Sequence, residues 1–183
     1  PRQSCGQSED GKMRRAKRDL DRTRPYFHAL QTEIKRIFRT VEEVENRYFY
    51  PLDGSEAPDG TYGILVITAD RGLAGSYNKS VINHAQRLIS QHSDYKLFVV
   101  GEYGRQFFSN QQIAIEESFR YSAQNTSMNR AREISTKLLD LFDKGEIDKI
   151  FVVYSDLEEG LDIKVKSTRL LPFHRKKSVS FIV

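Results

Sequence analysis

A regular spacing of apolar residues near the start of the chain constrains its fold most strongly. The spacing alternates between three and four residues, which is the pattern of a helix that packs along another helix over several turns. The positions of this seam are Met13, Ala16, Leu20, Thr23, Phe27, Leu30, Ile34, Ile37, Val41, Val44 and Tyr48. A helix of that length would reach about 54 Å. The length of this seam therefore predicts a partner helix, either on another chain or on sequence not included here. The alternative is a helix that lies across its own domain.

The seam also suggests how the first part of the chain is divided. Pro25 falls inside the pattern and removes one helical hydrogen bond, so we expect a kink or a helix start near it, although the register continues across it. After Gln3, residues 4–11 read SCGQSEDG. Residues 1–11 continue no heptad, and we predict that they form a disordered or non-native end. We expect the helix over 12–50 and a globular domain over 51–183.

The globular part alternates strand patterns with helix patterns. We predict strands over 62–69, 96–100, 113–119 and 149–154, an edge or hairpin strand over 161–171, helices over 76–91 and from Met128 to Gly145, and a short helix through Phe107 and Phe108. Such alternation is typical of an α/β domain. The predicted fold is therefore α/β, a Rossmann-like and largely parallel sheet with helices on both faces, preceded by the long coiled-coil helix.

Basic residues are concentrated in one segment of the predicted helix. Residues 12–24 contain seven basic and two acidic residues, a net charge of +5, while the rest of the chain carries −1. Such a block can face nucleic acid, an anionic membrane or an acidic protein surface. Tyr26 and Phe27 follow the charges and do not interleave with them, so a basic nucleic-acid-binding module remains only an alternative.

A glycine-containing loop follows the first predicted strand of the globular part. The loop ADRGLAG, residues 69–75, has neither the three glycines of a dinucleotide fingerprint nor the Gly-Lys-Ser/Thr of a P-loop. Asp70 stands at the strand end, where its negative charge would oppose a phosphate. A nucleotide-binding domain is therefore the second alternative. The favoured interpretation is a strand-to-helix turn in which Asp70 and Arg71 pair with each other or face a protein partner.

No residue set predicts catalysis, a cofactor or a metal. His28, His84, His92 and His174 lack metal-ligand spacing, and the single Cys5 cannot form an internal disulfide. No run approaches the roughly 18 apolar residues of a membrane-spanning helix. These features predict a soluble, cytoplasmic chain that is not itself catalytic.

Six stretches, in this order, carry a resemblance to a known family. They are KMRRAK (12–17), RPYF (24–27), VITADRGLAGSYNKSVI (66–82), VVGEYGRQFF (99–108), LLDLFDKGEIDKIFVVYS (138–155) and TRLLPF (168–173). Together they resemble the gamma subunit of F-type ATP synthases over nearly the whole chain from Lys12 onward.

The resemblance implies a central-stalk rotor subunit that couples proton- or sodium-driven rotation to ATP synthesis or hydrolysis. The seam would pair with a C-terminal shaft helix that lies outside this sequence, inside the ring of alpha and beta subunits. The globular part would be the foot beside the epsilon subunit and the membrane c-ring, on the cytoplasmic face of a bacterial cell membrane. No cofactor and no nucleic acid is implied.

On this resemblance we assign contact residues for the two parts of the molecule. Arg14, Arg15 and Arg18 are predicted to face acidic parts of the catalytic ring. The contacts of the foot with the beta or epsilon subunit are assigned to the loop residues Asp70, Arg71, Gly72, Leu73 and Gly75.

Overall fold

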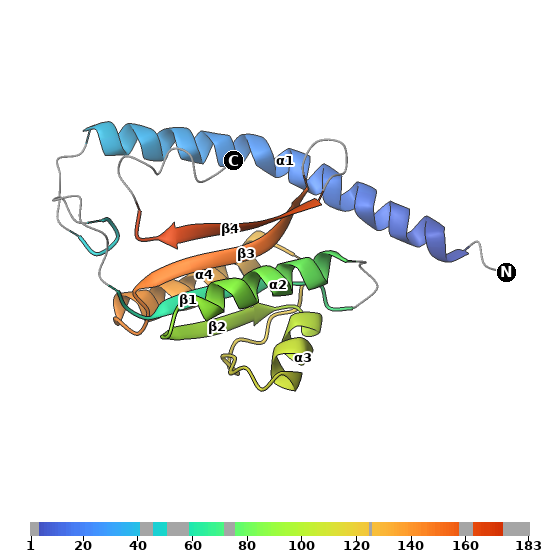
Figure 1. Cartoon of the computed structure of the whole chain (residues 1–183). Coiled ribbons are helices and arrows are strands. Elements are labelled where there is room, and N and C mark those ends of the chain that lie inside the picture. The colour runs from blue at the N-terminus through green and yellow to red at the C-terminus, as the bar shows by residue number, and fades with distance from the viewer. Residues whose placement is uncertain are drawn as a thin grey trace. The chain divides into compact units, whose positions relative to one another are not determined.

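The computed structural model describes residues 4–40, 46–50, 59–71, 76–124, 126–157 and 163–173. The chain divides into two compact units, Pro1–Val44 with Arg175–Val183, and Glu45–His174. Helix α1 (Ser4–Thr40) is the described element of the first unit, and the described residues of the second unit form a sheet and three helices (Figure 1). The second unit is called the foot below.

Helix α1 differs from the predicted helix at both ends. It begins at Ser4, so residues 4–11 of the segment predicted to be a disordered end are helical. A long helix extends readily because each added residue gains one hydrogen bond without a new nucleus. Pro25 lies inside α1, so no helix starts there. Residues 46–50 are not helical, and the predicted boundary at residue 50 is therefore too late.

The sheet of the foot has four strands in the order β2-β1-β3-β4. Strand β1 (Tyr62–Ile67) pairs in parallel with β2 (Tyr95–Val100) and with β3 (Lys149–Leu157), and β4 (Ile163–Leu171) runs antiparallel to β3 at the edge. β1 is therefore a central strand. Its nearly continuous apolar sequence YGILVI suits a strand that is covered on both faces. The largely parallel α/β fold predicted from the sequence is confirmed.

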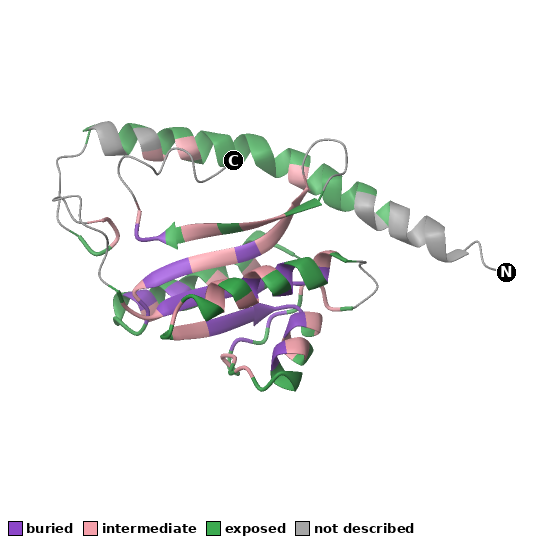
Figure 2. Ribbon diagram, in the orientation of Figure 1, coloured by how far each residue is buried: buried purple, intermediate pink, exposed green. Residues whose placement is uncertain are grey.

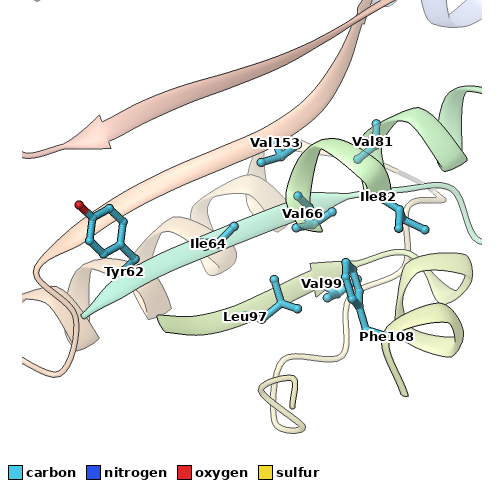
Figure 3. Close-up of a cluster of buried hydrophobic side chains, with 10 residues drawn as sticks. Tyr62, Ile64, Val66, Val81, Ile82, Leu97, Val99, Phe108 and Val153 are labelled. Atoms are coloured by element: carbon cyan, nitrogen blue, oxygen red, sulfur yellow. The ribbon is translucent and has the colours of Figure 1, made fainter. Parts of the chain in front are cut away.

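Helices cover both faces of this sheet. On one face α2 (Tyr77–Ser90) and α3 (Glu102–Asn110) pack on a cluster that includes Ile64, Val66 and Phe108 (Figure 3). On the other face α4 (Met128–Asp143) packs through Leu138 and Phe142 on a second cluster. The burial colours show the same division, with β1 buried between helices whose outer sides are exposed (Figure 2).

The predicted strand over 113–119 is wrong. Gln112 has a positive φ of 57°, and the segment that follows is irregular and makes one hydrogen bond to β2, from the Glu116 amide to the Leu97 carbonyl. Its apolar residues serve packing: Phe119 is buried against the Phe98 ring, with centroids 5.3 Å apart. The segment reaches β2 again only as a single bridge between Tyr121 and Val100. An irregular segment therefore covers this edge of the sheet, where a further strand could have paired.

Candidate functional site

The described part of the apolar seam is a surface feature of α1. Phe27, Leu30 and Ile37 are 42%, 43% and 50% exposed, although side chains of this kind each gain about 1.5–3 kcal/mol when fully buried. Ala16 and Thr23 are also exposed, while Leu20 and Ile34 are half-buried. Val41, Val44 and the side chain of Met13 lie outside the described residues. The exposed stripe is the surface expected of a helix that packs along a partner.

The basic residues occupy a different face of the same helix. Arg14, Arg15 and Arg18 are exposed, and their role in binding a partner stays a prediction. With about 3.6 residues per turn, they project on the side of α1 opposite the seam position Phe27. An apolar partner on the stripe would therefore leave these three guanidinium groups accessible to an acidic surface.

Asp70 lies at a junction of three segments of the foot. One carboxylate oxygen, Oδ1, accepts hydrogen bonds from the amides of Glu102 at 3.1 Å and Ala123 at 3.0 Å. The other, Oδ2, accepts from the Ser122 hydroxyl at 2.6 Å and from the Gln124 amide at 3.0 Å. The end of β1 is thereby tied to the first turn of α3 and to residues 122–124. This group of contacts is called the Asp70 junction.

The electrostatics of the junction favour the ionised carboxylate. Partial burial alone would raise the pKa of Asp70, but the hydrogen bonds from Ser122 and from the amides of Ala123, Glu102 and Gln124 outweigh it and lower the pKa from 3.8. Burial, with the charge of Asp70 acting in the same direction, raises the pKa of the nearby Tyr77 phenol. The negative charge at this strand end is thus held by the protein's own donors.

Two glycines allow the same segments to approach closely. A Cβ on Gly101 would lie 2.2 Å from the Thr68 carbonyl oxygen, and Gly101 has a φ of +95° that favours glycine. The Gly104 amide donates to the Thr68 hydroxyl at 3.0 Å, and that hydroxyl donates to the Val100 carbonyl at 3.1 Å. The ends of β1 and β2 and the start of α3 therefore meet with little space for side chains.

The predicted loop residues have different outcomes. The described hydrogen bonds of Asp70 come from Glu102, Ser122, Ala123 and Gln124, and none of them comes from Arg71. Arg71 is exposed, and its role in binding a partner stays a prediction. Gly72, Leu73 and Gly75 lie outside the described residues.

Sequence reasoning missed a second cluster, in residues 47–50. Tyr48 was assigned to the seam by its spacing. Its ring packs against the Phe142 ring in a tilted arrangement, with centroids 5.3 Å apart, and its hydroxyl donates a hydrogen bond to Asp143. That hydrogen bond raises the pKa of the Tyr48 phenol above its usual 10.0. The guanidinium of Arg47 lies 4.4 Å from the centroid of the same Phe142 ring. The aromatic run RYFY before Pro51 was the available signal for this packing.

Further sites are not found in the part of the chain that the structure describes. Within those residues, no group of three His, Cys, Asp or Glu side chains could hold a metal ion. The described helices also include none that is both long and apolar enough to span a bilayer.

Comparison with known proteins identifies the family. A family model described as ATP synthase matches residues 10–181. The chain is 39% identical to the ATP synthase gamma chain of Caldanaerobacter subterraneus subsp. tengcongensis over 161 residues, which cover 88% of this chain and 54% of the relative. It is 33% identical to the gamma chain of Acetivibrio thermocellus, with the same coverage. The chain thus spans about half the length of the curated relatives it matches.

A solved structure supports the fold independently. The chain is similar to one in the cryo-EM structure of the Tetrahymena thermophila mitochondrial ATP synthase central stalk and c-ring, with a TM-score of 0.63 and 22% identity. The match covers 89% of this chain and 68% of that chain. At this identity the likeness shows the fold, while the family rests on the sequence matches: the chain belongs to the ATP synthase family, and the relatives it matches there are gamma chains.

Proposed function

We propose that this chain is the larger N-terminal part of a central-stalk rotor subunit of an F-type ATP synthase. The observation that carries the proposal is the exposed apolar stripe of α1, in a chain that matches gamma chains over about half their length. A stripe of this kind needs a helical partner, and the rest of the full-length subunit can supply one. The family match favours this function over a nucleotide-binding domain or a nucleic-acid-binding module.

In this function the subunit couples by its shape and does no chemistry itself. Ion flow through the membrane c-ring would turn the foot, and the paired helices would turn inside the ring of alpha and beta subunits. The basic face of α1 would meet acidic surfaces of that ring, and the exposed Arg71 would contribute to a contact with the beta or epsilon subunit. The complex would place the subunit at the cytoplasmic face of a bacterial cell membrane.

Calorimetric titration of this chain with the epsilon subunit of the same organism tests the proposed place of the foot. We expect saturable one-to-one binding, weakened by Arg71→Glu because charge reversal at a contact opposes docking. Arg132→Glu, on the exposed side of α4, is the matched control and should bind as the unaltered chain does. A folded chain that binds no epsilon subunit would contradict the proposal. Binding to nucleotide or RNA would then favour an alternative function.

Charge reversal on α1 tests the proposed shaft. In a full-length subunit assembled into the synthase, Arg14→Glu with Arg15→Glu should lower coupled ATP synthesis severalfold, because two like charges would then face the acidic ring. Asp19→Lys with Asp21→Lys alters as many exposed charges on the same helix in the opposite sense and should be tolerated better. Unchanged synthesis in the arginine variant would remove the assigned role of these residues.

A further inference from the structure

The chain passes between its two units twice, and both passages begin at one place on the foot. The unit boundaries lie after Val44 and after His174. Just inside them, the Phe173 amide donates to the Tyr48 carbonyl at 2.7 Å, and the Tyr50 amide donates to the Phe173 carbonyl at 3.0 Å. These two hydrogen bonds form a short parallel bridge between Phe49 and Phe173. The incoming and outgoing segments are therefore bonded to each other where they join the foot.

The incoming segment is also held on the C-terminal end of α4 and the loop after it. The Arg47 guanidinium lies over the Phe142 ring and donates to the Ile147 carbonyl at 3.4 Å, with Asp148 Oδ1 3.6 Å away. The Tyr48 hydroxyl donates to Asp143 Oδ1 at 2.5 Å. Cation–π contacts and charge-assisted hydrogen bonds of this kind resist sliding better than apolar contact alone, because they fix direction as well as distance.

A second attachment joins the same segment to the edge strand β4. Arg169 lies with its guanidinium carbon 4.5 Å from the centroid of the Tyr50 ring and donates to the Tyr50 hydroxyl. Arg169 in turn is opposite Phe151 in the pairing of β4 with β3. The segment is thus anchored to the sheet through β4 and to the helical layer through α4.

We propose that residues 46–50 and Phe173 form an exit clamp, which holds both connections to the helical unit at one site so that torque passes between the units there. Two tethers that leave a domain separately and loosely would let the units turn against each other. Two tethers bonded together and anchored in two layers of the foot transmit a turn to the whole domain. This inference rests on the proposed rotor function for its purpose, while the clamp itself is a property of the foot.

Hydrogen exchange on this chain tests whether the clamp holds. The double variant Arg47→Ala/Tyr48→Phe removes the contacts to 143, 147 and 148 but neither donor of the bridge. We expect the Tyr50 and Phe173 amides to exchange at least about tenfold faster, since local opening sets their protection. Arg130→Ala removes a 3.8 Å ion pair with Glu133 near the start of α4, at the opposite end of that helix from Phe142, and should leave both amides as they were. Unchanged exchange at either amide in the double variant would overturn the clamp.

The β1 amides show whether the double variant is still folded. If they lose protection, Tyr48→Phe alone replaces it, with the same expected direction at Tyr50 and Phe173. This single variant keeps the ring on Phe142 and removes only the hydroxyl that binds Asp143.

The same variants in a full-length subunit, assembled into membrane-bound synthase, test the transmission of torque. We expect the number of coupling ions, protons or sodium, pumped per ATP hydrolysed to fall at least about twofold in the clamp variant and to stay unchanged in Arg130→Ala, because a loose joint lets hydrolysis proceed without turning the foot. A normal ratio despite loosened amides would overturn the proposal. Absence of pumping with the unaltered chain would instead refute the proposed function and leave the exchange result standing.

Discussion

Asp70→Asn is expected to lower the free energy of unfolding of the foot by about 2–3 kcal/mol at pH 7. The asparagine can keep one carbonyl oxygen for the amides of Glu102 and Ala123. Its NH₂ group would then stand where Oδ2 accepts from the Ser122 hydroxyl and the Gln124 amide, so donors would face donors. A loss of this size corresponds to a fall in melting temperature of roughly 5–12 °C, measured by thermal and urea unfolding.

The pH dependence of this loss distinguishes the charge from the shape of the side chain. Because hydrogen bonds lower the pKa of Asp70 below 3.8, its contribution is complete above the unfolded pKa and is lost as the pH falls through the folded one. The difference in unfolding free energy between the unaltered chain and Asp70→Asn should therefore narrow from pH 7 toward pH 3. Glu117→Gln, a matched change at an exposed carboxylate, should cost little at either pH. A difference that does not change with pH would contradict the assigned role of the charge.

The order of elements in the foot could be predicted because each element carries its own local signal. The apolar run of β1, the helical period of α2 and the glycine that ends α4 place these elements within a few residues of their observed bounds. Gly145 has a φ of +73°, the conformation expected just after a helix. Where a period continued by coincidence the prediction failed: Tyr48 fits the three–four spacing of the seam but packs on Phe142 of the foot.

The site could be predicted only in part, because its contacts join distant parts of the sequence. Asp70 was singled out by its place at a strand end, but its donors lie 32 to 54 residues further on. Only the parallel pairing of β1 with β2, which brings the carboxyl ends of both strands to one edge, makes them neighbours. The same holds for Arg47, whose partners Phe142, Ile147 and Asp148 come about 100 residues later. The sequence around a single residue does not show which distant residues it contacts in the fold.

Gly101→Ala is expected to destabilise the foot by about 3 kcal/mol or more, through two costs that act together. An alanine with φ near +95° is strained by about 1–3 kcal/mol. Its Cβ would also lie 2.2 Å from the Thr68 carbonyl oxygen and 2.8 Å from that of Ala69, and backbone atoms cannot move aside as the end of a side chain can. Overpacking of this kind costs a further 1–3 kcal/mol or so. Urea unfolding, followed by the circular dichroism of the sheet, measures this loss of unfolding free energy.

The junction makes this position less able to relax than an ordinary turn. The Gly101 amide donates to the Tyr121 carbonyl at 2.9 Å, and the Thr68 amide donates to the Val100 carbonyl at 2.9 Å, so backbone on either side of the glycine is already bonded. Gly11→Ala on α1 is the matched control, since its Cβ would meet nothing within 4 Å and should stabilise the helix by about 0.5–1 kcal/mol. If both alanines proved equally harmless, β1 and β2 would not meet α3 as closely as the Asp70 junction requires. A loss confined to Gly101 would place the constraint in the backbone, since the same side chain is added in both variants.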